Sequence, residues 1–393
     1  MASPDTLQNL TVDRVFPDLL TDEAEIFTIN SKKQHYHDVK FKLRMVSTYL
    51  TPLVFLVLAI LRIPNWFQQE LKNSGINDYY ILLVLLVSLI FILYTILILP
   101  LDLYYEHIER IFGFSTLSWK KWLRNVFINT VMTIVIYIII FICVYTTILF
   151  NPEYWWFFSF IILGIIFTLL MAVLPIYIMP LFTPLEPFPE GNLSNQINSL
   201  VKNMGLQIDG IYLRKASIET TKPGASVTGI GKNMKIILDD TLIKKFRDDE
   251  ISIVVAHELA HIKNRDLPLL LLVFNLINLF VFFLVNNLFF FAINWFDYSS
   301  KSDPASVAFF FFAWMFLFTF LAFILDAFSR WREKKADLLA LSIMNDFKAY
   351  KSGFLRLADL TLSYPDPSKL EVFFTYSHPP IKDRIKYGEQ FKQ

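Results

Sequence analysis

The sequence predicts a mostly α-helical, polytopic membrane protein with six transmembrane helices and a small α+β domain in water. The mean hydropathy is +0.47, with 55% hydrophobic and 18% charged residues. All charged residues, 36 Lys and Arg and 35 Asp and Glu, fall outside six long apolar windows. This pattern excludes a soluble single domain and a disordered chain. The charge-free windows are 45–61, 79–101, 125–152, 154–185, 267–296 and 305–325.

Each window is long enough, or nearly so, to span a bilayer, because a membrane helix needs about 20 apolar residues. Window 45–61 is the shortest, but Arg62 can extend its side chain to the interface. Lys and Arg concentrate before the first helix and between the second and third. The positive-inside tendency therefore predicts both termini and residues 186–266 on the cytoplasmic side. We expect a bacterial inner membrane or an endoplasmic-reticulum-type membrane.

The predicted organisation alternates membrane-embedded and water-exposed regions. A polar N-terminal segment, 1–44, precedes four transmembrane helices within 45–185. Residues 186–266 form a cytoplasmic α+β segment, and 267–325 supply two further transmembrane helices. Residues 326–393 return to the cytoplasm.

Turn residues and periodicity divide the segment 186–266 into short elements. Residues 192–204 predict an amphipathic helix, and 209–215 and 233–238 predict strands. The glycine-rich run 224–231 lies between the two strands. A further helix is expected from Asp248 through His261.

That last helix contains the candidate catalytic motif, His257-Glu258-Leu-Ala-His261. Positions i and i+4 lie about 5–6 Å apart on one helix face, so both imidazoles can reach one Zn²⁺. Glu258 points beside the metal and can act on its water. The alternative is two histidines on a solvated helix face with an acid nearby. The apolar approach to the motif and its place at the mouth of a membrane helix favour the metal site.

A zinc protease site needs a third protein ligand, and the membrane topology indicates where to look. The helix 267–296 leads away from the motif, and 305–325 returns to the same side. Just beyond it, Glu333 and Asp337 are again i and i+4. One carboxylate can bind zinc while the other accepts a hydrogen bond from a ligand histidine. The alternative is a charged, solvated helix start.

With these residues in place, the chain resembles the zinc-dependent CAAX prenyl proteases, an integral-membrane gluzincin family. The resemblance implies one zinc per chain held by His257, His261 and Glu333, with Glu258 as the catalytic glutamate. It also implies that Asp337 supports a ligand histidine. Family members usually have seven membrane helices, where six windows are found here. The motifs behind the resemblance are His257–His261 with Asn264-Arg265-Asp266, Ser329-Arg330, Glu333, Ala336-Asp337, Phe112-Gly113-Phe114, Met179-Pro180-Leu181-Phe182, Ile237-Leu238-Asp239, Thr241-Leu242, Ser377-His378-Pro379-Pro380 and Arg384.

The same resemblance implies that His378 and Arg384 contact the substrate or the oxyanion. His378 is the best donor to a tetrahedral oxyanion, although it could also be an ordinary loop histidine before two prolines. Gly224, Ala225 and Ser226 begin a candidate edge strand that a substrate backbone can join. A glycine-rich hairpin that binds nothing is the alternative. The family tends to carry Asn-Ala where this chain has Gly224-Ala225.

Three further features are expected to be structural. Asn275, Asn278 and Asn286 share one helix face, which should turn towards other helices or a wet interior. The run Phe309–Phe312, followed by Trp314, is expected to face lipid. His35 and His37 lie in a polar segment and are expected to be solvated.

The sequence thus predicts an integral-membrane zinc metalloendopeptidase that, by resemblance, removes the C-terminal tripeptide from prenylated CAAX-type proteins. A quality-control zinc protease acting on unprenylated or misfolded membrane proteins is the close alternative. A non-enzymatic membrane scaffold or transporter is the alternative from another class. Expected partners are a peptide or protein substrate, with or without a prenyl group, and membrane lipid. The net charge of +1 predicts no nucleic-acid partner.

Overall fold

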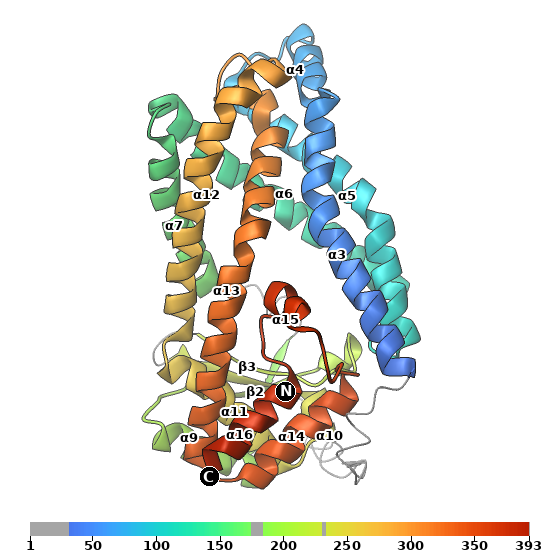
Figure 1. The fold of residues 1–393 in the computed structure, drawn as a ribbon, viewed down its shortest axis with the longest axis vertical. Helices are drawn as coiled ribbons and strands as arrows, with labels where there is room; N and C mark the ends of the chain where they lie inside the picture. The colour runs from blue at the N-terminus through green and yellow to red at the C-terminus, as the bar shows by residue number, and fades with distance from the viewer. Residues whose placement is uncertain (1–30, 174–183, 230–232, 393) are drawn as a thin grey trace.

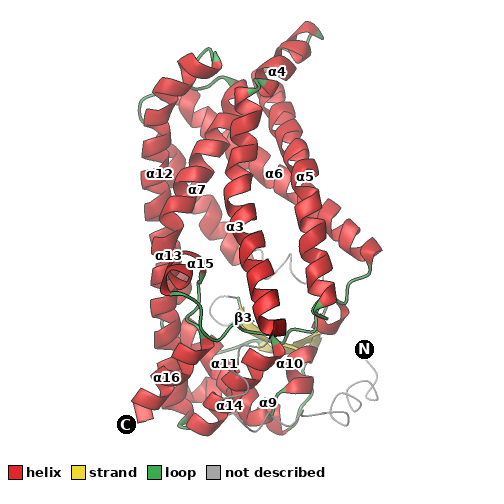
Figure 2. Cartoon of the chain, turned by 45° about the vertical axis from the view of Figure 1, so that its right-hand side comes forward, coloured by secondary structure: helices red, strands yellow, loops and turns green. Residues whose placement is uncertain are grey.

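The computed structural model describes residues 31–173, 184–229 and 233–392. Long helices form an elongated bundle, and a smaller mixed domain lies at its lower end (Figure 1). Strands gather in one place beneath the long helices (Figure 2). The long helices of the described chain are α3 (Ser31–Ile60), α5 (Tyr79–Ile111), α6 (Trp119–Phe150), α7 (Trp155–Val173), α12 (Asp266–Phe296) and α13 (Val307–Met344); the short α4 (Ile63–Asn73) lies at the far end.

Each predicted window corresponds to one of these helices. Within the described residues, five helices are long and apolar enough to cross a membrane. The sixth, α7, has a shorter apolar stretch, Trp155–Leu170, followed by residues 174–183, which lie outside the described residues. The motif Met179–Phe182 lies there too. The polytopic membrane fold is confirmed, and the number six is approximate.

The first helix differs from its predicted limits. α3 begins at Ser31, so residues 31–44 are helical and continue directly into the apolar part. They include Tyr36, which is buried beside Phe112 and Phe114. The positive charges predicted for a free polar segment therefore lie on the lower end of a long helix.

The prediction that Phe309–Phe312 face lipid is wrong for most of the run. Phe309, Phe310 and Phe311 are only 6%, 3% and 5% exposed. The run sits in the main core of the bundle, where Phe311 packs against Phe55 of α3 and Phe91 of α5. α13 lies between α3 and α12, so an apolar stretch that could face lipid packs against protein instead.

The asparagine face of α12 turns towards other helices, as predicted. Asn278 is buried and accepts a hydrogen bond from Trp314 Nε1 at 3.1 Å. Asn286 accepts one from Trp155 Nε1 at 2.7 Å. Asn275 bonds back to its own helix and lies against Gly164 of α7. These amides pair between or within helices, so none is left unpaired in an apolar core.

The lower domain contains a four-stranded sheet with the order β1-β2-β4-β3. β2 and β4 run parallel, with Gly210 opposite Lys235, and the other pairs are antiparallel. The predicted strands correspond to β2 and β4, and the glycine-rich run contains β3, while residues 230–231 of that run lie outside the described residues. The elements are β1 (Leu185–Pro187), α9 (Asn192–Asn203), β2 (Gly210–Arg214), β3 (Ala225–Thr228), β4 (Lys235–Asp239), α10 (Asp240–Lys245), α11 (Asp248–Lys263), α14 (Phe347–Leu360), α15 (Lys369–Thr375) and α16 (Ile381–Lys392).

A polar cluster joins the bundle to this domain. Glu109 of α5 accepts hydrogen bonds from Tyr36 at 2.8 Å, Lys40 at 2.7 Å and Lys222 at 2.6 Å. Lys222 lies three residues before Ala225, where β3 begins. The membrane helices thus help to fix the position of the edge strand.

His37, expected to be solvated, is instead largely covered. Its side chain is 15% exposed, stacks on Tyr364 at 4.0 Å and lies 2.7 Å from Glu371 of α15. The sequence places His37 and Glu371 more than 300 residues apart, so no local pattern could indicate the pair. His35 is exposed, as predicted.

Candidate active site

The helix α11 presents His257 and His261 from a well-anchored position. Acidic residues fill its first turn, where they complement the helix dipole, and Glu250 Oε2 accepts a hydrogen bond from the Arg247 backbone at 3.0 Å. The opposite face, including Val255 and Leu259, is completely buried in the lower core. The anchored helix therefore leaves both imidazoles on one side.

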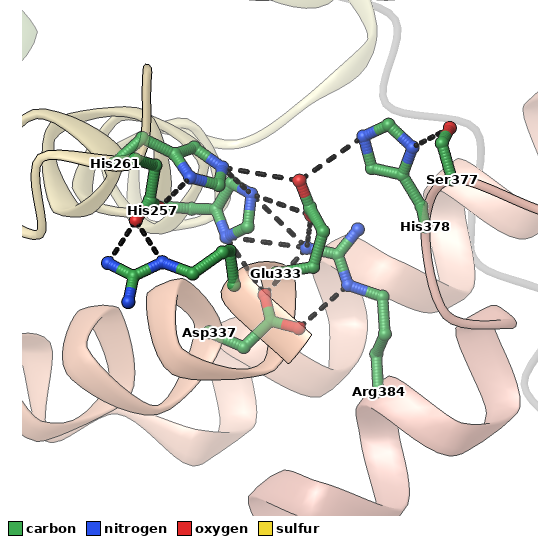
Figure 3. Close-up of polar contacts among 9 residues, drawn as sticks. His257, His261, Glu333, Asp337, Ser377, His378 and Arg384 are labelled. Atoms are coloured by element: carbon green, nitrogen blue, oxygen red, sulfur yellow. Dashed lines mark hydrogen bonds and ion pairs between the residues drawn. The ribbon is translucent and has the colours of Figure 1, made fainter. Parts of the chain in front are cut away.

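α13 brings a carboxylate to these imidazoles (Figure 3). His257 Nε2 lies 3.3 Å from Glu333 Oε2, and His261 Nε2 lies 3.4 Å from Glu333 Oε1. One ligand atom from each of the three residues falls within 4.8 Å of the others. The predicted set His257, His261 and Glu333 is thus brought together in a group that could hold a metal ion.

Carboxylates fix the orientation of both rings. Asp337 Oδ1 lies 2.9 Å from His257 Nδ1, and Asp266 Oδ2 lies 2.6 Å from His261 Nδ1. Each Nδ1 can donate to its carboxylate, which leaves the Nε2 lone pair free to bind a metal. Arg332, buried beside Asp266, pairs with it and donates to Asn264 O at 2.7 Å.

Two observations fit a divalent cation at this point. The buried Glu333 Oε2 has no hydrogen-bond partner among the described residues, and the two Nε2 atoms face each other at 3.1 Å. In the protonation state that binds a metal, with neutral imidazoles and ionised carboxylates, the four carboxylates and two guanidinium groups of the cluster sum to two excess negative charges. A divalent cation would balance that excess, which is costly to bury uncompensated. The charged members are Glu258, Asp266, Glu333, Asp337, Arg332 and Arg384.

Glu258 follows the first ligand histidine and lines a cavity of about 260 Å³. Burial raises the pKa of Glu258, and the nearby His257 and His261 lower it only in part. Burial lowers the pKa of His257, but Asp337 and Glu333 outweigh this effect and raise it to about 9. A carboxylate with a raised pKa can accept and return a proton near neutral pH.

His378 approaches the cluster from the loop between α15 and α16. Its Nε2 lies 3.3 Å from Glu333 Oε1, while its side chain is 62% exposed. Arg330 of α13 donates to Tyr376 O in this loop at 2.5 Å and to Val372 O of α15 at 3.0 Å. From α3, Arg44 donates to Thr375 O at 2.5 Å. Hydrogen bonds from α13 and α3 to this backbone therefore position His378, although its side chain is exposed.

Arg384 binds a carboxylate of the site. Its guanidinium forms two hydrogen bonds to Asp337, at 2.8 and 2.6 Å, and lies 3.6 Å from Glu333 (Figure 3). It also lines the cavity beside Glu258. Arg384 thus holds Asp337, the carboxylate next to His257. A contact between Arg384 and the substrate stays a prediction.

The candidate edge strand lies next to the motif helix. β3 pairs only with β4 among the described strands and packs beside α11. Gly224 and Ala225 line the cavity that contains Glu258, whereas Ser226 is not among its lining residues. A Cβ atom at Gly224 would lie 2.5 Å from Asp239 Oδ2, and Arg214 holds that carboxylate at 2.6–2.7 Å. The paired carboxylate therefore favours glycine where the resembled family tends to have asparagine.

Two protein-family models together match almost the whole chain. The model of peptidase family M48 matches residues 187–390, just over half of the sequence. The chain belongs to peptidase family M48. The CAAX prenyl protease N-terminal model, described by five membrane helices, matches residues 8–184. The sequence predicts four such helices within 45–185; the long apolar helices that the structure describes there are α3, which already begins at Ser31, α5, α6 and the shorter α7.

Relatives of this M48 chain span bacteria and eukaryotes. An uncharacterized metalloprotease, YhfN of Bacillus subtilis, is 25% identical over 91% of this chain and 84% of its own length. CAAX prenyl protease 1 of Saccharomyces cerevisiae is 26% identical over 74% of this chain and 68% of its own. The crystal structure of Saccharomyces mikatae Ste24p matches with a TM-score of 0.82 at 23% identity, covering 98% of this chain and 94% of that chain. The last match shows a shared fold.

The family membership confirms that the chain is an integral-membrane metalloendopeptidase. Peptides or proteins are therefore its substrates, and the scaffold or transporter alternative is set aside. Two polar residues of the M48 site were missed as site residues, Asp266 and Arg332. Asp266 stood in the motif Asn264-Arg265-Asp266, and its position five residues after His261 was the available signal. Arg332 had no signal beyond its place beside Glu333.

Proposed function

We propose that this chain is a zinc metalloendopeptidase that removes the C-terminal tripeptide from prenylated proteins at the cytoplasmic face of its membrane. The main evidence for this proposal is that His257, His261 and Glu333 come together beside Glu258. The substrate class is supported by relatives named CAAX prenyl protease 1 in Saccharomyces cerevisiae and Homo sapiens.

Zinc suits the donor set of the site. Two imidazole nitrogens and one carboxylate, with one position left for water, are typical of catalytic zinc. The M48 family is zinc-dependent in general, and one ion per chain fits the single His-His-Glu group of the described residues. Bound zinc would supply Lewis-acid chemistry, which polarises a carbonyl and makes water a better nucleophile near neutral pH.

Each remaining part of the reaction falls to a residue of this chain. Glu258 takes a proton from the attacking water and passes it to the leaving amine. His378 donates a hydrogen bond to the carbonyl oxygen as negative charge develops there. Asp337 and Asp266 hold the two imidazoles so that their Nε2 atoms face the Glu333 carboxylate and would be free to hold the ion.

The substrate backbone would pair with the free edge of β3, at Ala225 and Ser226. At Gly224 the backbone of the protein lines the cavity beside Glu258. That cavity has an apolar wall suited to an aliphatic side chain next to the cleaved bond. Its apolar wall includes Leu242, Phe246, Ile253, Val254, Phe354 and Leu357.

The positive-inside tendency supports a cytoplasmic active site. Lys32, Lys40 and Lys42 lie on the lower end of α3, the end that packs near the metal cluster's domain. Membrane lipid surrounds the bundle, in a bacterial inner membrane or an endoplasmic-reticulum-type membrane.

The decisive experiment compares a farnesylated peptide with its unprenylated twin. Zinc-loaded protein in nanodiscs should cut the farnesylated peptide faster and release the terminal tripeptide, as mapped by mass spectrometry. Similar rates for both peptides would favour the quality-control alternative. Absence of cleavage with bound zinc, in both peptides and in an unfolded membrane-protein substrate, would contradict the proposal.

A further inference from the structure

A second cavity, of about 340 Å³, lies between the lower part of α3, the loop 361–364 and α15. His378 lines both this cavity and the one that contains Glu258, so the two meet at His378. Neither the metal ligands nor Glu258 line the second cavity. The second cavity therefore adjoins, at His378, the cavity beside the metal cluster.

Besides His378, three basic side chains line this cavity, His37, Lys40 and Arg44, and they differ in their partners. His37 lies 2.7 Å from Glu371, and Lys40 lies 2.7 Å from Glu109. Arg44 has no carboxylate within ion-pair distance among the described residues, although Asp326 of α13 lies near enough to interact with its charge, and it donates a hydrogen bond to Thr375 O. Most of its guanidinium donors thus stay available for an anion.

The position of Arg44 is compatible with a three-residue tail. Arg44 binds the carbonyl of Thr375, three residues before His378. Three extended residues span at most about 10 Å, which is also the reach from a cleaved bond to the carboxylate of a tripeptide. The walls between include aromatic and proline side chains, Tyr364, Tyr376, Pro379 and Pro380, which suit aliphatic residues.

We propose that Arg44 binds the C-terminal carboxylate of the substrate in this cavity, so that the cut falls three residues from the chain end. The inference rests on the proposed function, because it assumes a tail cleaved at the metal cluster. Arginine suits the role, since its planar fork matches a carboxylate in two parallel hydrogen bonds.

The test compares one tail peptide as its free C-terminal acid and as its C-terminal amide. Wild-type protein should cleave the acid with a KM about tenfold below that of the amide, with similar kcat, as the loss of one charge-assisted contact implies. In Arg44→Gln the KM for the acid should rise to the amide's value. Arg44→Lys keeps the charge and should retain part of the preference.

Lys42→Gln is the matched control, because Lys42 is an exposed cation on the same helix that does not line the cavity. It should preserve the wild-type ratio of acid to amide. A tail lengthened by one residue should shift the cut by one residue in wild type and give mixed products in Arg44→Gln.

Four outcomes overturn the inference while leaving the proposed function intact. The first is equal cleavage of acid and amide by wild type, and the second is an unchanged ratio of acid to amide KM in Arg44→Gln. The third is an equal loss of cleavage for both peptides in that variant. The fourth is a preference for the acid that appears only when phosphatidylglycerol replaces phosphatidylcholine in the nanodiscs. The third outcome would mean that Arg44 only holds the end of α15 at Thr375. The fourth would mean that Arg44 binds a lipid headgroup. Failure of zinc-loaded wild type on every tail peptide would instead contradict the proposed function.

Discussion

The metal cluster and the loop that carries His378 meet at Glu333 but are built in different ways. In the cluster, regular helices present the ligands, and carboxylates fix both imidazoles. His378 is exposed and is positioned through backbone carbonyls that accept hydrogen bonds from Arg330 and Arg44. Helix spacing thus places each pair of site residues on one face and packing joins two helices at the metal cluster, whereas the loop has no regular spacing of its own and depends on contacts with α13 and α3.

The energetic consequences differ as well. Removing one partner from a buried charged cluster leaves another charge uncompensated, which costs several kcal/mol. Removing a hydrogen bond to an exposed loop releases the loop into water at a smaller cost, about 0.5–1.5 kcal/mol. Damage to the cluster should therefore abolish function, and damage to the loop's supports should reduce it by degrees.

The largest expected effect is that of Glu258→Gln. This substitution keeps the shape of the cluster but removes the base, so kcat should fall by about 10²–10⁴ while zinc content stays near one per chain. Peptide kinetics and elemental analysis on the same preparation measure both quantities. Substantial peptidase activity in this variant would refute the assignment of Glu258 as the base.

The counterpart in the loop is His378→Ala. Loss of a hydrogen-bond donor to the developing oxyanion should lower kcat by about 10²–10³ with KM and zinc content unchanged. His35→Ala, at an exposed histidine away from the cluster, is the control. If zinc is lost together with activity, His378 belongs to the metal cluster, and the two-region comparison fails.

Asp266→Asn tests whether the cluster needs its supporting carboxylates. Asp266 lies 2.6 Å from His261 Nδ1, so the variant should bind zinc about 10–100-fold more weakly, as measured by competition with a chelator. Asp297→Asn is the control, since Asp297 is exposed just past the other end of α12 and, among the described residues, forms an ion pair with Arg62 alone. An unchanged zinc affinity would show that the ring orientation of His261 does not depend on Asp266.

The smallest expected effect comes from Arg330→Gln, which should lower kcat about tenfold through the position of His378. Combined with His378→Ala, it should cause little further loss, because both changes act on the same step. Lys335→Gln, an exposed cation on the same helix face as Trp331, is the control. Additive losses in the double variant would show that Arg330 acts independently of His378.

The helical elements and the main candidate ligands could be predicted from the sequence alone. Hydropathy marks each membrane helix because the bilayer requires an uninterrupted apolar stretch. The i, i+4 spacing of His257 and His261, and again of Glu333 and Asp337, places each pair on one helix face. These are local properties, so a reading of neighbouring residues suffices. The roles of Arg384 and of residues 224–226 in substrate binding stay predictions.

Which helix faces and loops contact one another could be seen only in the folded chain. Composition shows that Phe309–Phe311 are apolar, but not whether lipid or protein covers them, and here it is protein. His37 pairs with Glu371, and Arg330 binds the loop before His378, across separations that no spacing rule covers. The physical reason is that a periodic pattern fixes the face of a single helix, whereas the partner of that face depends on how the whole chain packs.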